Sequence, residues 1–350
     1  MFRHWTSIFS LILLFSIFAF VDAGHPLWEF STKIKRAIPI DLNWPSITTW
    51  PGGTVTFCWE DEATRQQLGY RLRHAMNLWY MAGLPGNFRF QEVAHEDCMR
   101  DRRNSLVIHK APGSIEYITT VGKYVGPVDA INPGPYVYFN DEDEPSSNNA
   151  ARNTIAEKIA HEIGHIFGLY HEHQNPYFWR VRSLFTLGCE NIEGYDWTTA
   201  HLTQEEIWGE NGVCVNYNAA LEHDWATAAH FLPRPELAYI PHPDRESVNE
   251  DVDWDSIMLY HSNVASKRGA PRGYYPTLKR SRNGIGYKIR LKRAPSQKDV
   301  QGLIRLYDAS EQRPLPRLYH DPRSEYHTAF QNLQNFQACD WPPQAGPAGG

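Results

Sequence analysis

One short segment restricts this chain more than any other. Residues 154–172 read Thr-Ile-Ala-Glu-Lys-Ile-Ala-His-Glu-Ile-Gly-His-Ile-Phe-Gly-Leu-Tyr-His-Glu. Thr154 and Glu157 have the spacing of a capping box, so a helix is expected to begin there, and Gly168 suits the left-handed residue that ends one. Apolar residues recur at helical spacing and are expected to face the core: Ile155, Ile159, Ile163 and Ile166. The segment therefore predicts an amphipathic helix.

Three histidines of this segment have the spacing of metal ligands. His161 and His165, four residues apart, project together from a different face of the helix, where both imidazoles can reach one ion. Gly168 lets the chain turn sharply, so that His171 can return as a third ligand. Three neutral imidazoles leave an open coordination position, and nitrogen ligands suit zinc better than calcium or magnesium. The pattern predicts one catalytic Zn²⁺ site.

Glu162 is the candidate general base. It lies one step round the helix from His161, close to the metal without binding it. Zinc lowers the pKa of bound water to about 7, and a nearby carboxylate can accept the proton as the water attacks a carbonyl group. His173 has no place in this pattern and is expected to be exposed.

Two motifs together resemble a known family. The pattern HExxHxxGxxH is the metzincin signature, and with Glu172 after the third histidine the segment resembles the astacin family of zinc metalloendopeptidases. Residues 256–260, Ser-Ile-Met-Leu-Tyr, resemble that family's Met-turn. The resemblance implies an α+β fold of the metzincin type, a catalytic domain of two subdomains that contains a twisted, mixed β-sheet, the active-site helix and the Met-turn. It also implies that Tyr260 is a displaceable zinc ligand that stabilises the oxyanion of the tetrahedral intermediate.

Weaker similarities extend this resemblance over 37–310. Local patterns predict a helix over 62–81 and strands over 54–59, 88–93, 105–109 and 136–139. By resemblance, 136–139 is the edge strand that pairs antiparallel with an extended substrate, and 296–307 is the closing helix. The expected partners are therefore protein or peptide substrates bound in extended form.

The beginning of the chain is typical of a secretory signal peptide. Residues 1–23 combine a basic start, an apolar run and small or apolar residues before the cleavage point. The whole chain is 42% hydrophobic and 21% charged, with a net charge of -6, as in a soluble globular protein. We expect a secreted, extracellular protein that binds neither nucleic acid nor, once the signal is removed, a membrane.

The remaining chain divides into three parts. Residues 24–36 end in Lys35-Arg36 and are interpreted as a short propeptide, 37–310 as the catalytic domain, and 311–350 as a poorly ordered tail rich in Pro, Gly and Gln. In the family the mature amino terminus is buried near the glutamate after the third histidine. Cleavage would thus bring the amine of Ala37 towards Glu172, and a zymogen is expected, although 24–36 contains no aspartate that could block the zinc.

Five cysteines cannot all pair within one chain. Those usual in the family before and beside the edge strand are missing here. Cys189 and Cys214 fall in a stretch, 174–253, that is far longer than the family commonly has. Their pairing would close a loop of about 25 residues and stabilise the folded state by roughly 3 kcal/mol. Cys58 and Cys98 form a second candidate pair. Cys339 is then the unpaired cysteine.

Residues 256–298 contain many Lys and Arg residues but no Asp or Glu. By resemblance this segment lies beside the pockets for the residues after the cut. One hypothesis is that these pockets favour acidic side chains, and the alternative is a solvated basic face.

Two rival functions stay open at this stage. Another metzincin branch would usually carry a residue other than glutamate at position 172. A catalytically silent zinc-bearing adhesion or recognition protein would have no chemical need for Glu162 or Tyr260.

Overall fold

The computed structural model describes residues 38–43, 46–112, 117–129, 132–140, 155–180, 183–239, 245–267 and 275–311. The expected signal peptide and propeptide and, apart from Glu311, the expected tail lie outside these residues, as do Ala37, Thr154 and Cys339.

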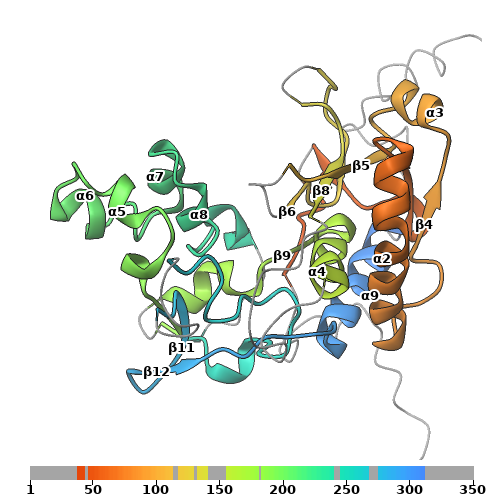
Figure 1. The fold of residues 1–350 in the computed structure, drawn as a ribbon. Helices are drawn as coiled ribbons and strands as arrows, with labels where there is room; N and C mark the ends of the chain where they lie inside the picture. The colour runs from red at the N-terminus through yellow and green to blue at the C-terminus, as the bar shows by residue number, and fades with distance from the viewer. Residues whose placement is uncertain are drawn as a thin grey trace, which may run out of the picture.

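A five-stranded mixed sheet forms one side of the molecule (Figure 1). Its strand order is β4 (Arg89–Glu92), β3 (Thr54–Trp59), β5 (Leu106–Lys110), β8 (Tyr136–Phe139) and β6 (Tyr117–Thr119). The first four strands run parallel, and β6 pairs antiparallel with β8, so that Thr119 lies opposite Val137. The strand predicted over 136–139 therefore exists but is not the edge. That prediction was wrong because the three residues of β6 fold back onto β8 and take the edge position, a pairing that no local pattern reveals.

Three longer helices pack with this sheet: α2 (Glu62–Met81), α4 (Ile155–Phe167) and α9 (Gln297–Glu311). Asp61 caps α2, whose bounds are those predicted, and α2 packs against α4. The isoleucine stripe of α4 is buried as expected, within a first core that also contains Trp79, Met258 and Leu303. We call the sheet with these helices the first lobe.

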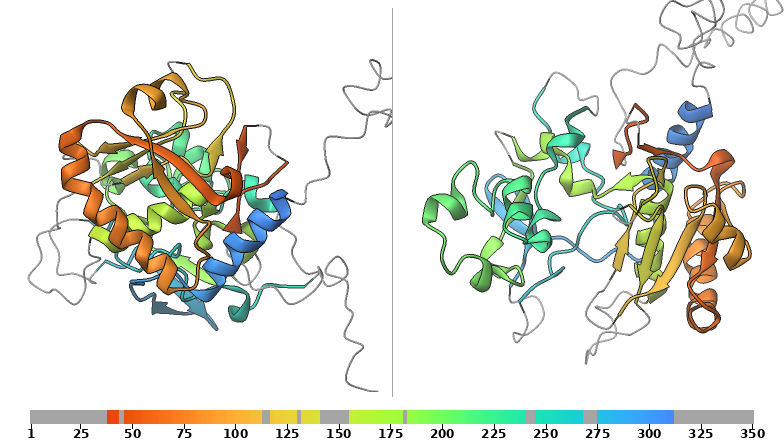
Figure 2. Two further views of the ribbon diagram at one scale, coloured as in Figure 1. Left: turned by 90° about the vertical axis from the view of Figure 1, so that its right-hand side faces the viewer. Right: turned by 90° about the horizontal axis from the view of Figure 1, so that it is seen from above.

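A second lobe lies on the other side of α4 (Figure 2). It contains the short helices α5 (Tyr195–Thr198), α6 (Gln204–Trp208), α7 (Tyr217–Glu222) and α8 (Ala226–Ala229), and a sheet of β10 (Phe185–Leu187), β11 (Leu278–Arg282) and β12 (Ile285–Lys288). Its own second core includes Phe231 and Leu259. The mixed sheet of the first lobe and the separate core of the second lobe confirm the expected α+β fold with two subdomains.

Several smaller elements make up the rest of the described secondary structure. They are α3 (His95–Arg100), the strand pairs β1 (Ile38–Pro39) with β9 (Leu169–Tyr170) and β2 (Ile47–Thr48) with β7 (Lys123–Tyr124), and 3₁₀ turns at 51–53, 172–174, 176–179, 189–191, 235–239 and 249–251.

Two disulfides confirm the predicted pairs. Cys58 on β3 is joined to Cys98 on α3, and Cys189 is joined to Cys214 within the second lobe. Such bonds fit an oxidising compartment. Within the described ranges, no helix has both the length and the apolar character needed to cross a bilayer.

Candidate metal centre and active site

The end of α4 brings the three histidines together. His161 and His165 lie on the last turns of the helix, and Gly168 follows with a φ of 108°. Glycine adopts this left-handed conformation without strain. The chain then reverses into β9 and presents His171 to the other two imidazoles.

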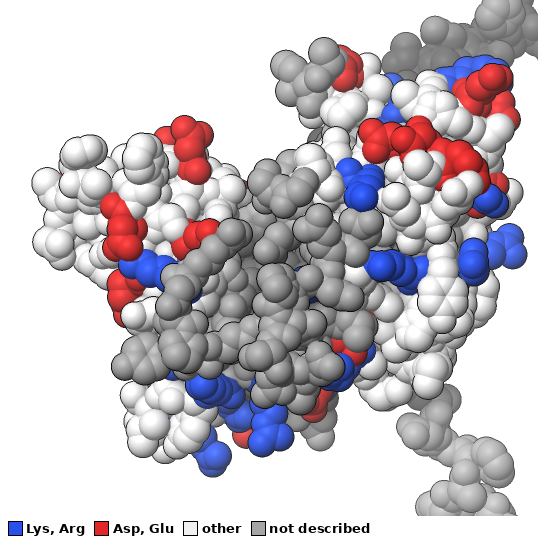
Figure 3. All heavy atoms as spheres, viewed as in Figure 1, with Lys and Arg blue, Asp and Glu red and all other residues white. Residues whose placement is uncertain are grey.

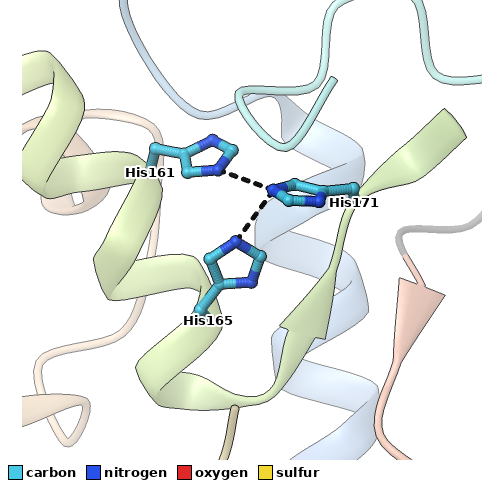
Figure 4. Close-up of side chains that lie close together, drawn as sticks. All are labelled: His161, His165 and His171. Carbon is cyan, nitrogen blue, oxygen red and sulfur yellow. Dashed lines mark hydrogen bonds between the residues drawn. The ribbon is translucent and has the colours of Figure 1, made fainter. Parts of the chain in front are cut away.

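All three imidazoles point their Nε2 atoms at one position (Figure 4). His171 Nε2 lies 3.1 Å from both His161 Nε2 and His165 Nε2. Each Nδ1 contacts an oxygen: the Ile257 carbonyl at 2.7 Å for His161, the Leu169 carbonyl at 2.7 Å for His165, and Gln174 Oε1 at 3.1 Å for His171. Because these oxygens are acceptors, each Nδ1 carries the proton and three unprotonated Nε2 atoms face one another.

This donor set fits zinc. Two nitrogens at about 2.05 Å from a tetrahedral zinc ion are about 3.3 Å apart, close to the separations found here. Burial lowers the pKa of His161 to about 4 and holds the pKa of His165 and His171 well below the usual value, so the imidazoles are neutral. Three neutral nitrogens that converge without protons between them form a site that could hold a metal ion.

Glu162 lies beside this cluster and contacts the edge strand. Its Oε2 accepts a hydrogen bond from Thr119 Oγ1 on β6. Burial raises the pKa of Glu162 to about 7, and the bond from Thr119 opposes that rise. A cation at the neighbouring histidines would favour the ionised form. Sequence reasoning missed Thr119, because its position depends on the unforeseen strand β6.

The Met-turn packs beneath the histidines and against α4. Met258 is buried, and a Cβ atom added to Gly164 would lie 2.4 Å from Met258 Sδ. Asp299 on α9 holds the turn, since its carboxylate accepts hydrogen bonds from Ser256 Oγ at 2.6 Å and from the Ile257 amide at 2.9 Å. Burial raises the pKa of Asp299 to about 6, and these bonds oppose that rise. Asp299 was also missed, although its spacing from Ser296 is that of a helix cap.

Tyr260 lies against the third histidine. Its ring centroid is 4.3 Å from that of His171 and 4.6 Å from that of His173. The expectation that His173 is exposed was wrong: it is fully buried and stacks on His171 at 5.3 Å with an interplanar angle of 16°. The second lobe covers His173, whose Nε2 donates a hydrogen bond to the His230 carbonyl at 2.8 Å.

Glu172 lies next to the beginning of the described chain. Its Oε1 accepts from the Asp253 amide at 2.8 Å, whereas its buried Oε2 has no hydrogen-bond partner among the described residues. Burial raises the pKa of Glu172 well above its usual value. Ile38 on β1 pairs with Tyr170 on β9, which precedes Glu172 by two residues.

The basic segment forms part of the second lobe. Several of its charges are paired: Lys267 with Asp196 at 2.6 Å, Lys292 with Asp255 at 2.7 Å and Arg293 with Glu157 at 3.1 Å. Others, including Arg282 and Lys288, are exposed near β11 and β12, where basic side chains gather (Figure 3).

The sequence matches no protein-family model and no curated protein sequence. Among solved structures, the chain is similar to high choriolytic enzyme 1, a hatching enzyme zinc-protease from the medaka fish Oryzias latipes, with a TM-score of 0.41 and 14% identity over 77% of this chain and 98% of that one. It is also similar to myroilysin, with a TM-score of 0.37 and 16% identity over 79% of this chain and 99% of that one. These values are too low for either likeness to carry an argument about function.

Proposed function

We propose that this chain is a secreted, astacin-like zinc endopeptidase. The observation that carries the proposal is the convergence of three unprotonated Nε2 atoms beside the carboxylate of Glu162. His161, His165 and His171 would hold the ion. Bound zinc would supply a Lewis acid that polarises a carbonyl group and lowers the pKa of a water molecule.

The protein's own residues would then move the proton and stabilise the developing charge. Glu162 accepts a proton from the attacking water and passes it to the leaving amine. Thr119 orients that carboxylate by its hydrogen bond. Tyr260 donates its hydroxyl proton in a hydrogen bond to the oxyanion, and its ring is held for this by contact with His171.

Substrate would bind in extended form along β6. This strand is the edge of the sheet and includes Thr119, which contacts Glu162. Main-chain hydrogen bonds to such an edge give affinity without demanding a particular sequence. The exposed basic side chains of β11 and β12 support the further proposal that acidic residues are preferred after the cut; equal cleavage of Asp, Ala and Lys at that position in a peptide library would contradict it.

Activation is proposed to require cleavage after Arg36. The new amine of Ala37 would neutralise the Glu172 carboxylate, whose Oε2 is buried without a described partner. The uncleaved chain would therefore be a zymogen.

The experiment compares wild type, Glu162→Ala and Tyr260→Phe on casein, with zinc and with a chelator. Glu162→Ala is expected to keep zinc and lose turnover by about 100-fold or more, and Tyr260→Phe to lose about 10-fold or more. Tyr70→Phe, at an exposed position on α2, is the matched control and should behave as wild type. Casein cleavage by Glu162→Ala at the wild-type rate would refute the mechanism, and a wild type that binds zinc without cleaving any peptide would favour a silent recognition protein.

A further inference from the structure

The long stretch 174–253, to which the sequence assigns no role, reaches the metal site. The turn after α8 is fastened to the residues that directly follow the third histidine. His173 Nε2 donates to the His230 carbonyl at 2.8 Å, and the Arg234 amide donates to the Gln174 carbonyl at 2.9 Å. Gln174 is itself the residue that contacts His171 Nδ1. The position of His230 is therefore fixed by the same backbone that positions a metal ligand.

The two side chains of this turn point to different surroundings. Phe231 is fully buried, and its ring meets that of Tyr260 edge to face at 5.2 Å. His230 is exposed to solvent, yet its ring centroid lies only 6.1 Å from that of His171. No described residue forms a hydrogen bond with its imidazole.

His230 is exposed although its imidazole lies near a metal ligand. Protein atoms crowd its imidazole enough for desolvation to lower its pKa, although the side chain remains accessible to solvent. Its ring makes an angle of 50° with that of His171 instead of stacking on it. An exposed histidine whose ring lies 6.1 Å from that of a metal ligand can contact a peptide bound at the metal position.

We propose that His230 is a substrate-binding residue, which donates a hydrogen bond from its imidazole to a carbonyl oxygen of the peptide beside the scissile bond. This inference rests on the proposed peptidase function. It assigns to the long stretch the task of completing the cleft wall on the side of His171. Loss of a neutral hydrogen bond of this kind should weaken peptide binding about three- to tenfold, which corresponds to about 0.65–1.4 kcal/mol.

The experiment measures binding instead of turnover. Isothermal titration compares two probes on the zinc-loaded protein: acetohydroxamate, which contacts little besides the metal, and a phosphinic peptide with alanine side chains on both sides of the phosphinate, which also occupies the cleft. His230→Ala and His230→Phe should raise the Kd of the phosphinic peptide about three- to tenfold and leave the Kd of acetohydroxamate unchanged. His230→Gln, which keeps a donor, should recover part of the affinity. His223→Ala, an exposed histidine of the same stretch, is the control.

Each other outcome overturns the inference. If His230→Ala weakens zinc binding in competition with a chelator, His230 is a metal ligand instead. If the affinities for both probes fall together with the thermal midpoint, its role is structural. If neither affinity changes while wild type still cleaves casein, the inference fails and the peptidase function stands. If wild type binds zinc but neither binds the phosphinic peptide nor cleaves casein, the proposed function itself has failed.

Discussion

Replacing Gly164 by alanine tests the packing between the metal-binding helix and the Met-turn. Alanine in a helix interior normally stabilises by about 0.5–1 kcal/mol relative to glycine. Here the added Cβ would lie 2.4 Å from Met258 Sδ, 3.2 Å from Met258 Cε and 3.3 Å from Trp79 Cζ2. Overpacking of a core costs about 1–3 kcal/mol. Gly164→Ala is therefore expected to lower the free energy of unfolding by about 1–2 kcal/mol.

Gly69 provides the matched control. It lies inside α2, and the nearest atoms to an added Cβ, in Arg73 and Trp59, are 3.8 Å away. Gly69→Ala should consequently stabilise the protein by up to about 1 kcal/mol. If Gly164→Ala lowers the free energy of unfolding while Gly69→Ala raises it, the difference can be assigned to the close packing around Gly164, chiefly the contact with Met258.

A double-mutant cycle measures that contact directly. Met258→Ala alone should cost about 2–5 kcal/mol, because it leaves a cavity. In the double variant the alanine at 164 no longer meets Sδ or Cε, so the combined cost should be less than the sum by about 1–3 kcal/mol. The assay is urea unfolding of all variants at one zinc concentration, since bound metal adds stability by mass action. Stabilisation by Gly164→Ala, or additivity within about 0.5 kcal/mol, would refute the reasoning.

Two further predictions concern the supports of the site. Between pH 4 and 6 the folded state keeps a proton on Asp299, whose pKa rises from 3.8 to about 6, that the unfolded state releases; the contribution of this carboxyl to the free energy of unfolding should thus fall by about 3 kcal/mol as pH rises through this window. The buried histidines contribute with the opposite sign in wild type and variant alike, so the test is the difference between wild type and Asp299→Asn, which can still accept from Ile257 and donate to Ser256. That difference between the two urea midpoints should change from pH 4 to 6, and a difference independent of pH would contradict the argument. Gln174→Ala removes the oxygen that orients His171 and should weaken zinc binding about 10-fold or more in competition with a chelator, whereas Gln174→Glu keeps an acceptor and should not; equal zinc affinity in wild type and Gln174→Ala would count against this support.

The sequence predicts those parts of the site that depend on local spacing. His161, His165 and Glu162 share one helix, and the turn at Gly168 that returns His171 follows from the conformational freedom of glycine. The bounds of α2 were also predictable, because helical periodicity is a local property. Both disulfides could be proposed because five cysteines leave few possible pairings.

The parts that were missed depend on contacts between distant segments. Thr119 meets Glu162 because β6 pairs with β8 from the far edge, and His173 is buried because a turn some 57 residues later accepts its hydrogen bond. Asp299 comes from a helix 43 residues after Ser256. Each of these contacts is made by a single polar side chain that is not part of a periodic sequence pattern, so nothing in the local sequence indicates its partner.

The boundary between the two cores falls inside the Met-turn. Met258 belongs to the first core together with the isoleucines of α4, whereas Leu259 and Tyr260 pack with the second. A rotation of one lobe against the other would leave the imidazoles of α4 in place but shift Tyr260 and His230 relative to them. Metal retention and turnover are therefore separable in the proposed enzyme: heat or cosolvent that loosens the second core should abolish peptide cleavage while the ion is still held.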